Sequence, residues 1–276
     1  MTAESAPQAQ PATGSESQRA PTEHDHVRWF WEHYDDAAQQ IVDFFADEGL
    51  ELSGKWIADI GCGDGIIDLG VFHKSKPAKL VGYDVREPDP AALQRIVEAV
   101  GLDQPIPDDD HFALTASRET HLPAPNDTFD FAFSWSVFEH VSKPVEMFGE
   151  IRRVLKPTGA LFLQVWPLYY SEHGGHLWLS YPEGFSHLLR EDEEIQGDVR
   201  FGPGTDPTRS GGAEEYGSLN RITIDDLQRA LLAGGLIVTK LQLITETLHI
   251  PPAVALRPLS GLGISGVKLL AVPRFK

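Results

Sequence analysis

The sequence contains only one cysteine, Cys62, among its 276 residues. A single cysteine cannot form a disulfide within the chain, and it cannot build a zinc site from several cysteines. Disulfide-stabilised scaffolds and cysteine-rich zinc modules are therefore excluded. Because the cysteine content does not call for an oxidising environment, we expect a protein of the reducing cytoplasm.

Long hydrophobic runs and an excess of basic residues are also missing. A transmembrane helix needs roughly 20 consecutive apolar residues, whereas the apolar stretches here are interrupted by Asp, Gly or Pro. We therefore expect no membrane span. The chain carries 41 acidic against 23 basic residues, a formal net charge of −18. A field of that sign repels phosphate backbones, which argues against nucleic acid as a partner.

The first 23 residues differ in composition from the rest. They are dominated by Ala, Pro, Gln, Ser and Thr, and they lack the apolar segment after a basic start that marks a secretory signal. Such a composition offers too little apolar surface to fold. We expect residues 1–23 to be a disordered tail and residues 24–276 to form the folded domain.

Beyond the tail, β-rich runs alternate with amphipathic helical patterns. The predicted helices cover residues 35–49, 90–100, 144–155 and 223–233. The predicted strands cover residues 56–61, 80–85, 112–116, 129–135, 160–166, 236–248 and 266–273. The spacing of Thr223 and Asp226 predicts a capping box at the start of the last helix. This alternation is typical of the α/β class, and we expect a Rossmann-like, seven-stranded, mostly parallel sheet with helices on both faces.

Residues 167–222 break this alternation. They contain aromatic residues, histidines, an acidic run at Glu191–Glu194 and a Gly/Pro-rich segment at 202–212. This insertion follows the fifth predicted strand, and open α/β sheets bind ligands at the carboxyl ends of their strands. We expect 167–222 to be a substrate cover or lid. Within it, 202–212 is predicted to be a mobile loop and the acidic run a solvated surface.

A glycine-rich turn, Asp59-Ile60-Gly61-Cys62-Gly63-Asp64-Gly65, follows the first predicted strand and precedes a helical pattern. Glycines let the chain turn tightly and let a ligand approach the main chain. A dinucleotide fingerprint would need a third glycine where Ile66 stands, so the spacing argues against a nicotinamide cofactor. The second strand ends at Asp84, whose carboxylate can accept both hydroxyls of a ribose. Together the two features favour S-adenosylmethionine as the ligand.

These residues resemble the glycine motif and acidic loop of the class I S-adenosylmethionine-dependent methyltransferases. The resemblance extends over about residues 27–273 and continues through 121–123, 126–130, 139–141 and 153–159. It implies cofactor-binding roles for Asp59, Gly61, Cys62, Gly63, Asp84, Val85, Ser117 and Ser134. Many members carry an aspartate that contacts the adenine just after the third strand, and this sequence has Ser117 at that place.

His140 is the candidate catalytic residue. The resemblance places it just past the fourth strand, at the mouth of the methyl-donor pocket. A histidine with a pKa of about 6.5 can accept the proton of an acceptor hydroxyl at neutral pH. The alternative interpretation is a helix-capping or buried structural histidine.

The insertion supplies the candidate substrate-binding residues Tyr169, Tyr170, His173, His176 and Trp178. Aromatic rings stack on the C–H faces of sugars, while polar groups bind the hydroxyls. His173 with His176, or His24 with His26, could instead hold a metal. The spacing identifies no carboxylate partner for either pair, so the metal ligands stay undefined.

The leading hypothesis is an O-methyltransferase that acts on a small-molecule hydroxyl, with a carbohydrate or polysaccharide precursor as acceptor. Bacterial sugar O-methyltransferases are similar in this arrangement, and part of them use a divalent cation such as magnesium. One alternative is methylation of a quinone or of another small-molecule carbon or amine. The other is a non-catalytic module that binds S-adenosylmethionine. A homodimer is a further hypothesis.

Overall fold

The computed structural model describes residues 23–178, 180–201 and 211–274 of the chain. The predicted disordered tail, apart from Glu23, lies outside the described residues. So does the predicted mobile loop, apart from Gly211 and Gly212, which open a helix.

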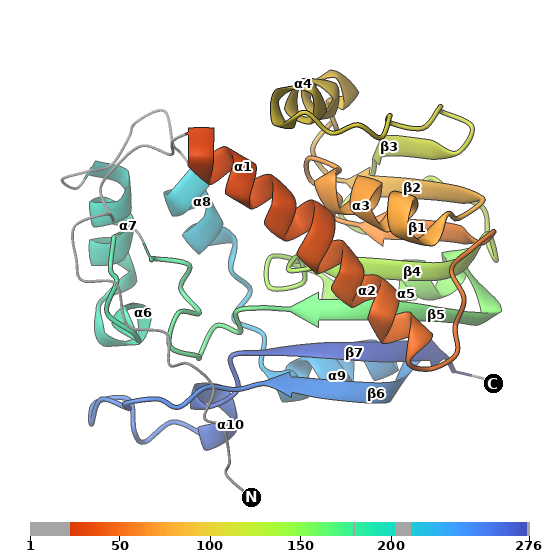
Figure 1. Ribbon diagram of the computed structural model, residues 1–276. Coiled ribbons are helices and arrows are strands. Elements are labelled where there is room, and N and C mark those ends of the chain that lie inside the picture. Colours follow the sequence, from red (N-terminus) through yellow and green to blue (C-terminus); the bar gives the residue numbers. More distant parts are fainter. Residues whose placement is uncertain (1–22, 179, 202–210, 275–276) are drawn as a thin grey trace, which may run out of the picture.

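A seven-stranded sheet forms the centre of the protein (Figure 1). Its strands are β1 (Trp56–Ile60), β2 (Lys79–Asp84), β3 (Phe112–Ala116), β4 (Phe129–Trp135), β5 (Leu155–Val165), β6 (Leu236–Ile244) and β7 (Gly266–Pro273). The strand order is β3-β2-β1-β4-β5-β7-β6. β7 runs antiparallel to both of its neighbours, β5 and β6, and the other neighbouring pairs are parallel. The predicted Rossmann-like, mostly parallel sheet is confirmed.

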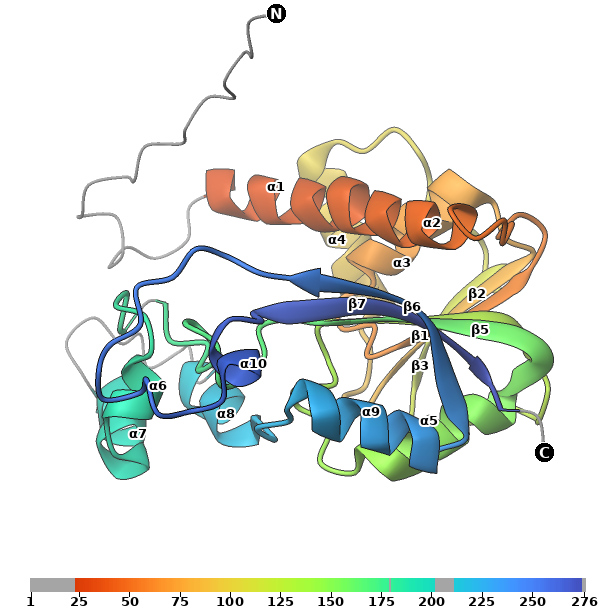
Figure 2. The ribbon, with the colours of Figure 1, turned by 90° about the horizontal axis from the view of Figure 1, so that it is seen from below.

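Helices cover both faces of this sheet (Figure 2). One face carries α1 (Glu23–Trp31), η1 (Glu32–Ala37), α2 (Ala38–Ala46), α3 (Ile66–Ser75) and α4 (Pro90–Val100). The other face carries α5 (Pro144–Val154) and α9 (Ile224–Ala233). The predicted capping box at the start of α9 is present, because Thr223 and Asp226 exchange side-chain and backbone hydrogen bonds.

The two faces bury separate apolar clusters, which is why the central strands are mostly hydrophobic. On the first face, the ring of Phe45 from α2 lies 5.2 Å from that of Phe131 in β4. On the second, the ring of Phe148 from α5 stacks on Phe138 at 4.4 Å. These packed layers fix where the ends of the strands lie.

The first helical segment begins earlier than the sequence pattern predicted. The chain is helical from Glu23 to Ala46, not from Asp35, and Phe30 and Tyr34 are buried with the core. The cause is η1, a π-helical stretch that interrupts the α-helical periodicity over residues 32–37. The i, i+3, i+4 spacing of an α-helix therefore does not apply across residues 32–37.

Two strand boundaries differ from prediction by more than one residue. β5 begins at Leu155, which pairs with Phe129 across a register shift, so the strand starts five residues before the predicted Ala160. β6 ends at Ile244, short of the predicted Leu248. The sequence pattern misses the early start of β5 because Pro157, Thr158 and Gly159 look like a turn rather than part of a strand.

The insertion lies beyond the carboxyl end of β5 and forms three short helices, α6 (Ser186–Leu189), α7 (Asp192–Phe201) and α8 (Gly211–Ser218) (Figure 1). It has an apolar cluster of its own: Tyr169, Leu177, Tyr181, Ile195, Val199, Tyr216 and Leu219. A further helix, α10 (Leu259–Leu262), lies in the β6–β7 connection. A covering role for the insertion stays a prediction.

The acidic run at Glu191–Glu194 was predicted to be a solvated surface, and its three glutamates are exposed, whereas Asp192 is half-buried and makes specific contacts. Its carboxylate accepts a 2.6 Å hydrogen bond from the Tyr216 hydroxyl and pairs with Arg221 at 2.5 Å. Acidic residues in the first turn of α7 also complement the helix dipole.

Within the described ranges, no helix has the length and apolarity that a membrane crossing requires.

Candidate functional site

The glycine-rich turn lies at the carboxyl end of β1 and is held between two other strand ends. Gly61, Gly63 and Gly65 have φ values of +89°, +53° and +79°, a region that side chains disfavour. The Gly61 amide donates to the Tyr83 carbonyl at the end of β2, at 2.7 Å. A Cβ atom on Gly61 would come within 2.4 Å of Val137, so this turn also touches the segment that follows β4.

Asp84 organises the adjacent strand ends. Its carboxylate accepts hydrogen bonds from the amides of Gly63 and Arg86, at 3.0 and 2.8 Å. Its backbone carbonyl accepts from the Ser117 amide at 2.7 Å, which brings the residue after β3 to the same place. Val85 lies beside it with 63% of its surface exposed. The structure thus brings together the predicted ribose-binding and adenine-binding residues.

These residues fit a nucleoside with a sulfonium tail. The Asp84 carboxylate, only 8% exposed as a residue, keeps lone pairs for ribose hydroxyls beyond its two amide contacts. A Cβ atom on Gly63 would meet nothing within 4 Å, so space lies open against the main chain of the turn. Val85 offers an exposed apolar side chain for an adenine ring. These features support the predicted cofactor-binding assignments, which stay proposals.

Two of the predicted cofactor-binding residues, Ser134 in β4 and Cys62 in the turn, have mainly internal contacts. The hydroxyl of Ser134 is fully buried and donates to the Ile60 carbonyl at 2.7 Å, so only its main chain is left for the cofactor. Cys62 is buried, and burial together with Asp68 raises the pKa of its thiol. The Asp64 carboxylate accepts from the Ile66 amide at 3.1 Å and so satisfies the first amide of α3, whose N-cap position is occupied by Gly65.

Asp59 and Asp68 form a buried carboxyl pair behind the glycine turn. Burial, and then the charge of Asp68, raise the pKa of Asp59 well above its usual range. Burial raises the pKa of Asp68 to about 7. Because two carboxylates cannot both ionise easily in the interior, the pair retains a proton near neutral pH.

We expect Asp68→Asn to stabilise the cofactor-free protein, increasingly so as the pH rises. The folded-state pKa of Asp68 lies above its unfolded value, so ionisation lowers the stability of the native protein between about pH 4 and pH 7. Asparagine cannot ionise, and its amide can donate to Asp59. The melting temperature of the variant relative to wild type should rise by at least about 2–4 °C between acidic and neutral pH, the shift that 1 kcal/mol produces. A constant difference across this range would contradict the assignment.

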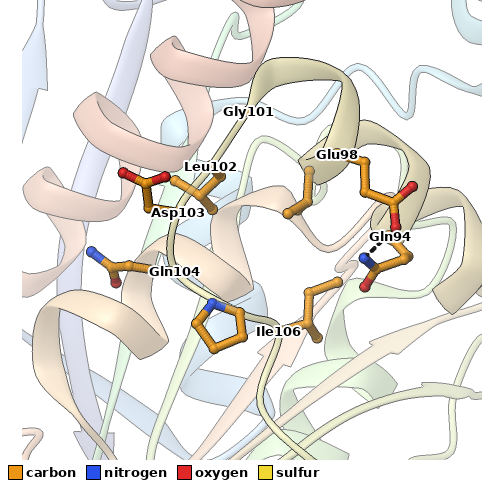
Figure 3. Close-up of a pocket in the computed structure, with 9 residues that line it drawn as sticks. Gln94, Glu98, Gly101, Leu102, Asp103, Gln104 and Ile106 are labelled. Atoms are coloured by element: carbon orange, nitrogen blue, oxygen red, sulfur yellow. Dashed lines mark hydrogen bonds between the residues drawn. The ribbon is translucent and has the colours of Figure 1, made fainter.

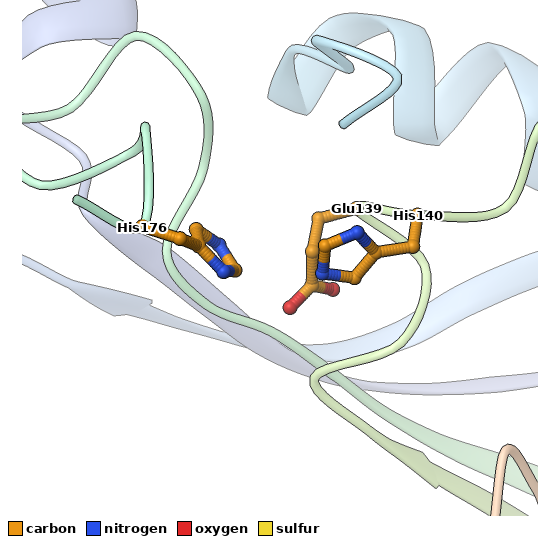
Figure 4. Close-up of side chains that lie close together, drawn as sticks. All are labelled: Glu139, His140 and His176. Atoms are coloured by element: carbon orange, nitrogen blue, oxygen red, sulfur yellow. The ribbon is translucent and has the colours of Figure 1, made fainter. Parts of the chain in front are cut away.

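A second cluster lies past the carboxyl end of β4, where Glu139 and His140 approach His176 from the insertion (Figure 4). One ligand-type atom from each of the three side chains lies within 4.8 Å of the other two. The Glu139 residue is 3% exposed. Within the part of the chain that the structure describes, neither Glu139 carboxylate oxygen nor the His176 Nε2 atom has a hydrogen-bond partner.

The Nδ1 atoms of His140 and His176 are both hydrogen-bonded. His140 Nδ1 lies 2.7 Å from the Ser218 hydroxyl, and that hydroxyl donates to the Glu215 carbonyl. Since the hydroxyl proton is used there, His140 Nδ1–H must be the donor. His176 Nδ1 lies 2.8 Å from the Glu215 carboxylate. Both bonds place the proton on Nδ1, so both Nε2 lone pairs face inward.

Burial decides the charge of this cluster. It raises the pKa of Glu139 to about 8. Burial, and then the neighbouring His176, lower the pKa of His140 to about 4. A neutral His140 is therefore the form present near pH 7, whereas the sequence suggested titration near the ordinary value.

The remaining candidate residues of the insertion divide into two groups. Tyr169 is only 5% exposed and packs in the apolar cluster of the insertion, which argues against direct contact with a substrate. Trp178 is 37% exposed and stacks on Trp166 with centroids 5.9 Å apart. Its ring also lies 5.3 Å from that of His176 and 6.4 Å from that of His173. Trp166 and Trp178, the tryptophan pair, therefore border the cluster of Glu139, His140 and His176, which we call the histidine cluster.

Hollows elsewhere in the described part of the protein include two that differ in their relation to the candidate residues. One of about 400 Å³ is lined by α4 and the loop that follows it, residues 94–106, and includes none of the candidate residues (Figure 3). The other, about 290 Å³, lies against Tyr170, where Arg257 covers the tyrosine ring at 5.3 Å. Tyr170 thus lines this second hollow together with Arg257.

A family model described as a methyltransferase domain matches residues 30–239. The chain belongs to the methyltransferase domain family. The prediction of an S-adenosylmethionine-dependent methyltransferase is confirmed at the level of the family, and the family and the fold support this methyl donor. The match describes a methyltransferase domain and does not specify a sugar O-methyltransferase.

Curated relatives of this methyltransferase match it over part of their length. An uncharacterized methyltransferase of Mycobacterium ulcerans is 29% identical over 166 residues, which cover 60% of this chain and 58% of the relative. A ubiquinone biosynthesis O-methyltransferase of Hahella chejuensis is 31% identical over 118 residues, which cover 43% and 46%. The chain thus spans about half the length of these relatives.

A solved S-adenosylmethionine-dependent methyltransferase from Methanosarcina mazei shares the fold. The alignment has a TM-score of 0.51 and 19% identity, and it covers 84% of this chain and 98% of that one. At this identity the likeness establishes the fold and not the acceptor.

Sequence reasoning missed Glu139, Ser218 and Glu215 as members of the histidine cluster. Glu139 directly precedes His140, so a search for a carboxylate next to a candidate histidine would have found it. Ser218 and Glu215 meet the histidines only through the fold, with 78 and 39 residues of separation. No spacing in the sequence signals these contacts.

Proposed function

We propose that this methyltransferase transfers the methyl group of S-adenosylmethionine to a hydroxyl of a small, ring-bearing molecule. The observation that carries the proposal is the position of His140. Val137 touches the glycine turn at Gly61, and the His140 amide donates to the Val137 carbonyl at 2.9 Å. The histidine cluster therefore lies one turn of chain from the proposed cofactor site.

The bound cofactor supplies an activated methyl group. The chain's own residues would then bind the ribose through Asp84 and align the acceptor oxygen with the methyl carbon. A neutral hydroxyl must also lose its proton during transfer. His140 is placed to assist that loss, because its Nδ1 atom is bonded to Ser218 and its Nε2 lone pair is left free on the side of Glu139 and His176.

A carbohydrate or polysaccharide precursor fits the exposed surface beside this cluster. The Trp166–Trp178 stack offers an aromatic face, and His173 with His176 adds polar groups next to it. Sugars bind to such surfaces by stacking their C–H faces and hydrogen-bonding their hydroxyls. The net charge of −18 supports an acceptor without multiple phosphates.

A quinone precursor is the second candidate acceptor. The relative from Hahella chejuensis is a ubiquinone biosynthesis O-methyltransferase, and a phenolic ring can also stack on tryptophan. Transfer of label from S-adenosylmethionine to fractions of a metabolite extract tests both acceptors. Label in the polar carbohydrate fraction supports the first and label in the lipid fraction the second. Cofactor binding without label in any fraction would favour a non-catalytic module.

We expect Trp178→Ala to weaken acceptor binding selectively. Removing an exposed aromatic face should raise the acceptor KM by about two- to tenfold, the equivalent of about 0.5–1.5 kcal/mol of ring stacking. Affinity for S-adenosylhomocysteine should stay the same. Trp29→Ala is the matched control, because Trp29 is 53% exposed but belongs to α1. Equal KM values in wild type and Trp178→Ala would remove the tryptophan pair from the acceptor site.

A further inference from the structure

We propose that Glu139, His140 and His176 bind a divalent transition-metal ion, of the kind that zinc, cobalt and iron(II) represent. The proposal rests first on the three side chains themselves. They come from the segment after β4 and from the insertion, and their ligand atoms lie within 4.8 Å of one another. Bonds of roughly 2.0–2.2 Å to a shared ion would draw them closer together.

The unpartnered atoms point to a ligand in this space. Glu139 is buried, yet among the residues described neither of its oxygens has a hydrogen-bond donor. His176 Nε2 is also buried and has no hydrogen-bond partner among the residues described. A buried carboxylate without partners is costly, and a cation between these atoms would satisfy them together.

The surrounding hydrogen bonds hold both histidines in the form that binds metals. His176 donates from Nδ1 to the Glu215 carboxylate, and His140 donates from Nδ1 to Ser218. Metal-binding histidines almost always use their second nitrogen in this way, which fixes the ring and raises the basicity of the ligating atom. Both Nε2 lone pairs are then directed at Glu139.

The donor set selects the class of metal. Two imidazoles and one carboxylate suit zinc and first-row transition ions, whereas magnesium prefers oxygen ligands with several waters. Three protein ligands also leave a coordination position open. Resting on the proposed function, that open position would receive the acceptor oxygen, so the ion would link the insertion to the cofactor domain at the acceptor.

The test is titration of the full-length, chelator-treated protein with Co²⁺ and, separately, Zn²⁺ and Mg²⁺. We expect one equivalent of Co²⁺ or Zn²⁺ to bind, with visible Co²⁺ absorption, and Mg²⁺ to bind far more weakly. His176→Ala and Glu139→Gln should weaken Co²⁺ binding strongly. Glu215→Gln, which changes only the outer partner, should weaken it by about 10–100-fold. His111→Ala is the control, because that histidine is exposed and pairs with Asp108.

Affinity for S-adenosylhomocysteine shows that each variant is folded and separates this proposal from the proposed function. Metal binding without methyl transfer would support the metal site and contradict the proposed methyl transfer. The proposal is overturned if wild type binds no stoichiometric Co²⁺, or if His176→Ala and Glu215→Gln bind it as wild type does. Should His176→Ala fail to fold, the wild-type spectrum and the Glu215→Gln affinity still decide.

Discussion

His140→Ala is expected to lower the turnover number by about 10²–10⁴-fold, the range by which a positioned proton-transfer group accelerates a reaction. Whether His140 accepts the proton itself or holds an ion that acidifies the hydroxyl, its loss affects the transition state. The cofactor site should be spared, because Asp84 and the glycine turn make no hydrogen bond to His140 among those described. Single-turnover kinetics measures the rate of methyl transfer, and titration calorimetry measures the affinity for S-adenosylhomocysteine.

The result must be separated from a loss of structure. His249→Ala is a suitable control, since His249 is exposed in the β6–β7 connection. A purely structural role for His140 would lower the melting temperature and the activity together. Normal turnover by a folded His140→Ala protein would remove this residue from the mechanism and transfer attention to His173.

Asp84→Ala should weaken S-adenosylhomocysteine binding by about 10-fold to 150-fold, since a hydrogen bond to a charged group is worth about 1.5–3 kcal/mol. Its carboxylate also holds the Gly63 and Arg86 amides. The variant therefore loses a ribose ligand and loosens the glycine turn at once, which favours the upper end of the range.

Asp84→Asn helps to separate these two effects. The amide oxygen can still accept from one main-chain amide, but the negative charge toward the ribose is lost. An intermediate dissociation constant would show that the charge contributes apart from the turn. Asp103→Ala, an exposed carboxylate in the loop after α4, controls for the change in net charge. An unchanged constant in Asp84→Ala would place the cofactor elsewhere.

The sheet could be predicted from the sequence because its strands are short, mostly apolar runs bounded by turn residues. Phe112–Ala116, Phe129–Trp135 and Gly266–Pro273 have the predicted bounds. The glycine turn and Asp84 were also found, because both depend on local spacing. The first helix was misplaced where π-helical geometry over 32–37 changes the period.

The histidine cluster could be predicted only in part. His140 and His176 were singled out separately, as a base and as an insertion residue. That they face each other depends on how the insertion folds back over the end of β4, a long-range contact without a local signal. Tyr169 shows the opposite failure: an aromatic residue that resembles a binding group packs in the insertion core.

The central claim is that the chain moves a methyl group from S-adenosylmethionine to oxygen. The most direct test supplies the protein with cofactor labelled with ¹³C in its methyl group and with the acceptor fraction that takes up label. The ¹³C spectrum of the product distinguishes methyl groups on oxygen, nitrogen and carbon. We predict a single O-methyl signal, which His140→Ala should form about 10²–10⁴-fold more slowly. A labelled methyl group on nitrogen or carbon would contradict the account.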